Sequence, residues 1–240
     1  MRVDIWSDVV CPWCYVGKRR FEAALAGFAH RDGVEVRWRS FELDPGAPRS
    51  RDTDRIDHLA TKYRIPREQA EAMERQITEV GLAVGLDFRL ERSRGGNSFD
   101  AHRLVHLAAE HGLGDQMKER LFRAYFTDGE PIGDPATLAR LAVSVGLPPA
   151  EVDDVLAGDR YAEAVRADEA TAHAYGATGV PFFVIDETYG IAGAQSSEVF
   201  TNVLERAWSE THAEAAETPA VSVSGVSPPD AGCGDGACPA

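Results

Sequence analysis

The tetrapeptide Cys11-Pro12-Trp13-Cys14 lies where a strand pattern passes into a helix pattern, and this placement constrains the chain more than any other feature. Residues 3–6 alternate between apolar and polar side chains, as in a short strand. From Pro12 onward apolar residues recur at helical spacing, and a proline fits the first helical turn because its missing N–H costs little there. Residues 34–43 again alternate between apolar and polar side chains and are predicted to form a second strand. The sequence therefore opens as strand–helix–strand with a CxxC motif at the start of the helix.

The two cysteines of this motif are suited to thiol–disulfide exchange, which needs one reactive thiolate and a second thiol close enough to resolve the mixed disulfide. At a helix N-terminus the dipole and the unpaired N–H groups stabilise the Cys11 thiolate, while Cys14 lies one turn further in and acts second. Two cysteines at this spacing also suit one half of a zinc site. The flanking strand and helix favour redox exchange over that alternative.

The rest of the chain is predicted to be a helical insertion followed by the second part of the same α/β unit. Residues 51–175 contain several helical patterns, with breaks expected at Pro66, Gly81 and other glycines and prolines. Strand patterns return at 180–185 and 189–192, before a helix over 196–210. We expect an α/β protein with four segments: a first α/β part (1–48), an inserted helical domain (49–176), a second α/β part (177–211) and a flexible C-terminal tail (212–240).

Composition and charge disfavour several classes of function. The 240 residues carry 25 Lys and Arg against 39 Asp and Glu, a net charge of −14. A nucleic-acid partner would call for clustered positive charge. No apolar run approaches the ~20 residues that span a bilayer, and the first ten residues do not resemble a signal peptide. We expect no nucleic-acid partner, no membrane association and a cytoplasmic location.

Several blocks of sequence resemble one family. The start WSDVVCPWCYVGKRRFE, the segment GVPFFVID and the GAQ that follows it are similar to the DsbA family of thiol oxidoreductases, in particular its FrnE-like branch. The resemblance extends from Met1 to about Glu210. It implies a thioredoxin fold with a large inserted α-helical domain, and disulfide oxidoreductase activity on protein or peptide thiols and disulfides, with no cofactor. The oligomeric state stays open, with a dimer among the states the resemblance allows.

The resemblance also implies roles for individual residues. Cys11 would be the attacking cysteine and Cys14 the resolving one, with Pro12 and Trp13 between them and Trp13 exposed as a substrate contact. Val180-Pro181 would hold the substrate chain opposite the cysteines, with Pro181 in the cis form. A proline that merely opens a strand is the alternative. Since no His stands between the cysteines, we expect a milder oxidant than the periplasmic enzymes of the family.

A second cysteine pair, Cys233 and Cys238, stands near the C-terminus in a segment rich in Gly, Pro and Ser. A C-terminal pair of this kind also occurs in some FrnE-like proteins. A flexible tail could bring it to Cys11 and Cys14 and pass electrons within the chain. The alternatives are a tail whose cysteines have no role and a four-thiolate zinc site that joins both pairs.

Two other residues, Asn97 and His102, lie in a segment similar to one that lines the active site of kappa-class glutathione transferases and hydroxychromene carboxylate isomerases. These residues could bind substrate or glutathione. The alternative interpretation is that the segment is the start of an ordinary capped helix. His106 and His111 are expected to be solvated rather than metal ligands. Two further functions stay open: a glutathione-dependent isomerase or transferase, and a zinc-binding or holdase module. The intact CPWC motif argues against the first, because a second thiol beside Cys11 would trap glutathione as a disulfide.

Overall fold

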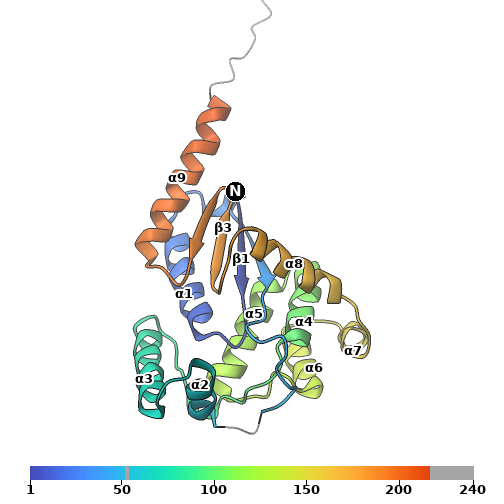
Figure 1. Ribbon diagram of the computed structural model, residues 1–240. Coiled ribbons are helices and arrows are strands. Elements are labelled where there is room, and N and C mark those ends of the chain that lie inside the picture. The colour runs from blue at the N-terminus through green and yellow to red at the C-terminus, as the bar shows by residue number, and fades with distance from the viewer. Residues whose placement is uncertain (52–53, 217–240) are drawn as a thin grey trace, which may run out of the picture.

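The computed structural model describes residues 1–51 and 54–216. Its sheet has the strand order β2-β1-β3-β4 and forms the upper part of the molecule in Figure 1. β1 pairs in parallel with β2 and antiparallel with β3, which pairs antiparallel with β4. This is the sheet expected of a thioredoxin fold. The strands are β1 (Arg2–Ser7), β2 (Glu35–Ser40), β3 (Phe182–Ile185) and β4 (Tyr189–Ala192).

Between β2 and β3 the chain is mostly helical, and most of this segment forms the lower part of the molecule in Figure 1, which confirms the predicted helical insertion. None of the helices in the described part of the chain combines the length and apolar character needed to cross a membrane. The helices are α1 (Pro12–Gly27), α2 (Arg55–Tyr63), α3 (Arg67–Ala83), α4 (Phe99–Glu110), α5 (Gly114–Arg123), α6 (Pro135–Ser144), α7 (Pro149–Ala157), α8 (Ala162–Ala174) and α9 (Ser197–Ala216). Short 3-10 turns η1 (Arg31–Gly33) and η2 (Leu90–Arg92) and a π-helical turn η3 (Ala124–Asp128) complete the set.

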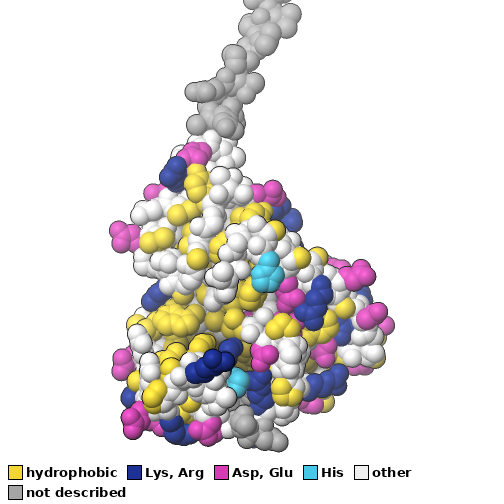
Figure 2. All heavy atoms as spheres, in the orientation of Figure 1, with side chains coloured by type: hydrophobic (Ala, Val, Ile, Leu, Met, Phe, Trp, Pro, Cys, Tyr) yellow, Lys and Arg dark blue, Asp and Glu magenta, His cyan; other side chains and the backbone are white. Residues whose placement is uncertain are grey.

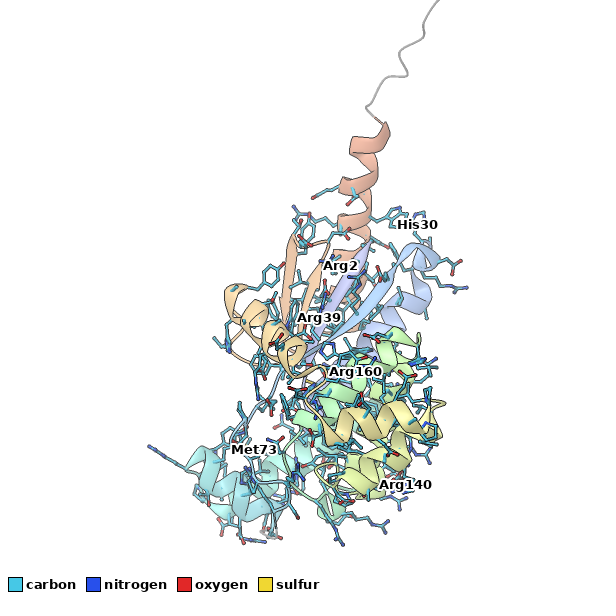
Figure 3. The ribbon with its side chains drawn as sticks, turned by 90° about the vertical axis from the view of Figure 1, so that its right-hand side faces the viewer. Arg2, His30, Arg39, Met73, Arg140 and Arg160 are labelled. Carbon is cyan, nitrogen blue, oxygen red and sulfur yellow. The ribbon has the colours of Figure 1, made fainter. Side chains whose placement is uncertain are left out.

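The two faces of the sheet are covered by different helices, as strand alternation requires. Val3 and Ile5 of β1 pack with buried residues of α1 and α9 on one face. Trp6 lies on the other face, where it packs with Ala172 of α8. On that second face the guanidinium of Arg39 on β2, labelled in Figure 3, bridges buried Asp4 of β1 at 2.7 Å and Asp168 of α8 at 3.2 Å. Hydrophobic packing and ion pairing thus fix α8 against the sheet.

Two sequence expectations about helix boundaries are wrong. Gly81 does not break a helix, because α3 continues to Ala83. A Cβ at this position would lie 2.6 Å from the ring of Phe88, so the glycine lets that ring pack directly on the helix backbone. At the other end of the chain α9 extends to Ala216, past the boundary expected at residue 211. The rest of the predicted tail lies outside the described residues.

The contact between α9 and the sheet should contribute to the stability of the fold. Phe200 is fully buried, with its ring centroid 4.6 Å from that of Phe183 and 5.7 Å from that of Phe21. Phe200→Ala should therefore lower the free energy of unfolding by about 3–5 kcal/mol, as measured by urea titration. Val199→Ala, one residue away at a 37% exposed position, should change it by less than about 1 kcal/mol. Equal losses in the two variants would contradict this packing.

Candidate active site

The CPWC motif begins α1, as predicted. Cys11 is the N-cap residue and Pro12 the first helical residue, and no side chain caps the helix. Cys11 is only 5% exposed and Cys14 only 1%, while Trp13 between them is 40% exposed. Both cysteines are free thiols. Cys11 is therefore largely buried, and the pocket described below opens beside it.

Val180 and Pro181 lie opposite the motif. The peptide bond between them is cis, the geometry expected from the sequence. The Cys11 thiol donates a hydrogen bond of 3.5 Å to the Val180 carbonyl oxygen. Gly17, one turn after Cys14, lies close to this proline. A Cβ at position 17 would lie only 3.0 Å from Cγ of Pro181. A glycine at this point lets α1 approach the proline closely.

Cys14, the last residue of the motif, is buried and has polar groups among its neighbours. Burial and the neighbouring Cys11 thiol raise the pKa of Cys14 well above its ordinary value, whereas the charge of Lys118 and the side chain of Ser7 act to lower it. Lys118 of α5 is fully buried and donates a 3.0 Å hydrogen bond to the Ser7 carbonyl oxygen. Burial lowers the pKa of Lys118 to about 8. The Cys14 thiol and the Lys118 amine therefore act on each other's pKa within one buried region.

Asp8 and His102 form a second buried pair beside the motif. Asp8 Oδ2 accepts a 2.7 Å hydrogen bond from the Leu43 amide, and Asp8 Oδ1 lies 3.4 Å from His102 Nε2. Burial alone would raise the pKa of Asp8, but His102, the Leu43 amide and Ser98 together lower it below its ordinary value. Burial lowers the pKa of His102, which favours the neutral form of its ring. The pair holds the loop between β1 and α1 against the segment that follows β2.

A pocket of about 210 Å³ opens beside Cys11 and is lined partly by α2 and α3 of the insertion. In Figure 2 hydrophobic side chains gather above α2 and α3, with Lys, Arg and His side chains at the lower edge. The exposed apolar side chains of this pocket come from Trp13, Leu43, Tyr63 and Met73. An apolar ligand bound there would lie next to the sulfur of Cys11.

Asn97 and His102 do not line this pocket, so the structure gives no support to their predicted role in substrate binding. His102 is buried against Asp8, and Asn97, which precedes the N-cap residue Ser98, accepts a hydrogen bond at Oδ1 from the amide of Phe99, the first residue of α4. His106 is also not solvated as expected, since its ring nitrogen lies 3.1 Å from Asp168 and from Ser40 Oγ. Cys233 and Cys238 lie outside the described residues.

Sequence reasoning missed Lys118, Asp168 and the residues of the pocket on α2 and α3. One signal pointed to Lys118: it shares a helix face with apolar Leu121 and Phe122, where a lysine is out of place. Nothing in the local sequence indicates that α2 and α3 face Cys11, because that placement depends on the packing of the whole insertion.

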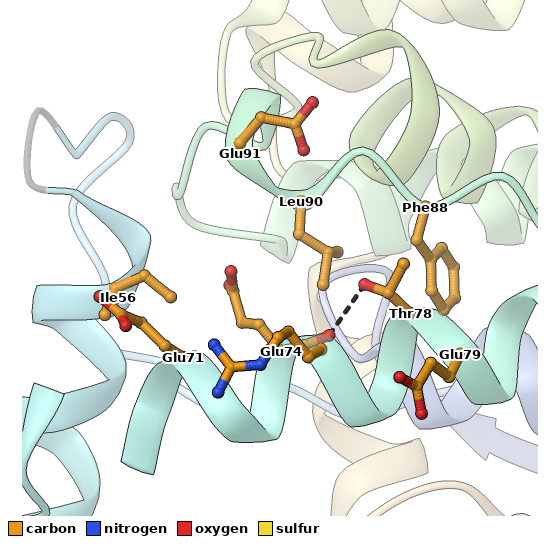
Figure 4. A pocket seen from close by; sticks show the side chains of 9 residues that line it. Ile56, Glu71, Glu74, Thr78, Glu79, Phe88, Leu90 and Glu91 are labelled. Carbon is orange, nitrogen blue, oxygen red and sulfur yellow. Dashed lines mark hydrogen bonds between the residues drawn. The ribbon is translucent and has the colours of Figure 1, made fainter. Parts of the chain in front are cut away.

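A second pocket, between α2, α3 and η2, has a different character (Figure 4). Four glutamates contribute to its lining, among them Glu74, whose backbone carbonyl accepts a 2.8 Å hydrogen bond from Thr78 Oγ1. It contains no cysteine. Within residues 1–51 and 54–216 no three His, Cys, Asp or Glu side chains are grouped to hold a metal ion.

Comparison with known proteins agrees with this geometry. The family model of the DSBA-like thioredoxin domain matches residues 2–205. The chain belongs to this family. Membership makes it a DsbA-like thiol–disulfide oxidoreductase, whereas its assignment to the FrnE-like branch stays a prediction.

Three relatives show how far the likeness of this DSBA-like protein extends. It is 50% identical to a probable DsbA oxidoreductase from Streptomyces coelicolor, whose crystal structure superposes with a TM-score of 0.84 over 88% of this chain and 91% of the other. It is 31% identical to the uncharacterized protein YwbO of Bacillus subtilis (strain 168), over 85% of this chain and 96% of that protein. The cytosolic disulfide reductase DsbM of Pseudomonas aeruginosa, in its structure with GSH, shares the fold at 19% identity, with a TM-score of 0.59 over 89% of this chain and all of the other.

The buried His102 makes the stability of this DSBA-like protein depend on pH. An unfolded chain protonates His102 as the pH falls through 6.5, whereas the folded chain, in which burial lowers this pKa, does not. The free energy of unfolding should therefore fall as the pH is lowered below about 6.5. His102→Gln should reduce the difference between urea titrations at pH 7 and pH 5, and exposed His111→Gln should not. An unchanged difference in His102→Gln would contradict this origin of the acid sensitivity.

Proposed function

We propose that this DSBA-like protein exchanges disulfides with protein or peptide substrates through Cys11 and Cys14. The observation that carries the proposal is the placement of Cys11 at the N-terminus of α1, 3.5 Å from the Val180 carbonyl and beside an apolar pocket. An extended substrate segment lying along Val180 would bring its sulfur to Cys11 and an apolar side chain to the pocket. The cytosolic location of DsbM, which shares the fold, supports the proposal that the reaction takes place in the cytoplasm.

The exchange proceeds in two steps. The Cys11 thiolate attacks one sulfur of a substrate disulfide and releases the other as a thiolate, which leaves a mixed disulfide. The Cys14 sulfur then attacks Cys11, and the substrate sulfur leaves with the electron pair and takes up a proton. The cysteine pair ends as a disulfide and the substrate as two thiols. Disulfide formation in a substrate is the reverse sequence, and the reduction potential of the pair against its surroundings decides the direction.

The cysteine variants should separate these steps. In Cys14→Ser the mixed disulfide cannot be resolved, so a disulfide-containing peptide should stay attached to Cys11 in nearly stoichiometric amount, as seen by mass spectrometry without reductant. Cys11→Ser should form no adduct at this site. A Cys233→Ser/Cys238→Ser variant is the control for the second pair. Equal trapping in Cys14→Ser and Cys11→Ser would contradict the assignment of Cys11 as the attacking residue.

A redox titration in glutathione buffers, with alkylation and peptide mass spectrometry on each cysteine pair, tests the function as a whole. We expect Cys11 and Cys14 to titrate as one two-electron couple between about −120 and −270 mV. A Cys233–Cys238 couple of similar potential would support the relay through the C-terminal pair. Thiols that resist alkylation until a chelator is added would support the zinc-binding module instead.

If substrates bind in the apolar pocket, substitutions of its lining residues should slow the exchange. Met73 and Leu43 line the pocket and are 40% and 36% exposed, so a bound peptide side chain can cover them. Met73→Asp or Leu43→Asp should slow exchange with an apolar peptide disulfide about tenfold, the factor that corresponds to about 1.4 kcal/mol of lost apolar contact. Leu82→Asp, on α3 at a 74% exposed position that does not line the pocket, is the matched control. Equal rates in all three variants would exclude the pocket from substrate binding.

One observation favours a glutathione-dependent isomerase or transferase as the second candidate. The pocket also contains Arg51, Arg55 and Lys62, whose positive charges suit the carboxylates of a small acidic thiol. Two of these charges already have carboxylate partners, since Arg51 pairs with Asp44 and Arg55 with Glu74. A stable glutathione adduct on wild-type Cys11, or a Cys11→Ser variant that still converts a small substrate with glutathione, would favour this candidate.

A further inference from the structure

Helix α2 differs from the other long elements around the site, because none of its residues is buried. It packs mainly on α3, beside which it lies in the lower part of the molecule in Figure 1. One helical face of α2 lines the pocket beside Cys11, with residues at positions i, i+3, i+4, i+7 and i+8: Arg55, His58, Leu59, Lys62 and Tyr63. This face is therefore a surface that a bound partner can cover.

The charges of α2 are divided between its two sides. The face toward the pocket carries three basic side chains, whereas Asp54, the N-cap residue, and Asp57 both pair with Arg67 of α3. In Figure 2 Lys, Arg and His side chains follow the lower edge of the hydrophobic surface. The chain as a whole has a net charge of −14, so its general field repels anions. The basic edge of this pocket is a local exception to that field.

The cations of the pocket differ in how far their charge is neutralised. Arg55 pairs with Glu74 at 2.5 Å, and Arg51, on the loop before α2, pairs with Asp44. Lys62 is exposed, and in the part of the chain that the structure describes no carboxylate lies within ion-pair distance of its ammonium. The charge of Lys62 is thus available to a ligand in the pocket.

His58 lies among these cations and responds to their charge. Arg51 Nη1 lies 2.9 Å from His58 Nδ1, in contact with the ring. Burial lowers the pKa of His58, and the positive charges of Arg51, Lys62 and Arg55 lower it further, while only Asp44 acts in the opposite direction. The charges around this ring therefore favour the entry of an anion over that of another cation.

The apolar part of the same pocket narrows the choice of anion. Trp13 is 40% and Tyr63 53% exposed, and Leu43 and Met73 also present apolar surface to the pocket. Glutathione has two carboxylates but no large apolar side chain, so it would leave this surface in contact with water. A peptide segment with one apolar and one acidic side chain near its cysteine covers the apolar wall and also reaches the basic edge.

We propose that the pocket selects protein or peptide substrates in which an acidic side chain lies close to the reacting cysteine and binds at Lys62. This substrate class rests on the exchange function proposed above. An apolar side chain next to the cysteine covers Trp13 and Leu43, while the substrate carboxylate pairs with the Lys62 ammonium. The exchange chemistry is unchanged. Lys62 is a specificity-determining residue, since it binds the substrate away from the sulfur atoms.

Two peptides that differ only in charge test this choice. Each carries one cysteine between two leucines, as a mixed disulfide with 2-thiopyridine, a neutral group whose release is followed by absorbance. The acidic peptide has glutamate beyond each leucine, and its twin has glutamine. The protein is the reduced full chain with Cys233→Ser and Cys238→Ser, so that only the CPWC pair reacts. At low salt the acidic peptide should react about fivefold faster, and 0.5 M NaCl should bring the ratio of rates close to one.

Variants of Lys62 assign this preference to the pocket. Lys62→Gln should lower the ratio of the two rates about threefold, and Lys62→Glu should reverse the preference. The ratio cancels any change in the reactivity of Cys11 that both peptides share. Arg64→Glu is the matched control, because this exposed C-cap residue of α2 makes the same change of net charge as Lys62→Glu at a position outside the pocket lining. It should keep the ratio within about twofold of the parent value.

The outcomes separate the two proposals. If neither peptide reacts faster with the parent protein than with its Cys11→Ser variant, the exchange function fails, and acidic selection fails with it. If both react but at equal rates, or if Lys62→Glu keeps the preference, only acidic selection is overturned. Equal loss of the preference in Arg64→Glu would indicate a general field effect and would also overturn it. So would a glutathione mixed disulfide that reacts faster than the acidic peptide, since it would assign the basic edge to glutathione.

Discussion

The antiparallel pairing of β1 with β3 is the interaction on which the active site depends. It joins the first strand of the chain to one that follows the whole helical insertion, with Trp6 opposite Phe182. β1 leads into Cys11 and β3 is preceded by Val180, so this register brings the carbonyl of Val180 to the thiol of Cys11. Closing so long a loop costs conformational entropy, which the fully buried side chains of β3 help to offset. The exchange site therefore exists only when both ends of the domain have met.

The helical insertion contributes more than a cover for one face of the sheet. It supplies α2 and α3, which line the pocket beside Cys11, and α5, whose buried Lys118 binds the Ser7 carbonyl at the end of β1. The two contributions differ in physical character: the pocket is open and largely apolar, whereas the surroundings of Lys118 are closed and polar. Cys11 lines the pocket, whereas Cys14 does not and is 1% exposed. Ion pairs between α1 and α5, including Lys18 with Glu119, hold the motif in register with this insertion.

Local signals in the sequence were sufficient for some of this arrangement. The CPWC motif at a helix start, the strand patterns and the order of the elements all depend on residues close together in the chain, and their prediction is confirmed. Gly81 was misread because a glycine that breaks a helix and one that admits Phe88 look alike in sequence. Asn97 and His102 were assigned from a likeness to other enzymes, yet one binds the first amide of α4 and the other is buried against Asp8. The pocket and the surroundings of Lys118 depend on tertiary packing, which no single segment encodes.

The π-helical turn η3 follows α5 directly and contributes one side chain to the pocket. Lys118 precedes it on α5, while Tyr125 lies within it, lines the pocket and contacts Arg55 through its hydroxyl at 3.3 Å. A π turn holds one residue more than an α turn, and each residue of an α-helix turns the following side chains by about 100°. Loss of one residue ahead of Tyr125 in this turn would rotate the Tyr125 side chain by about 100° relative to α5. The length of this turn therefore sets the direction in which the Tyr125 ring enters the pocket.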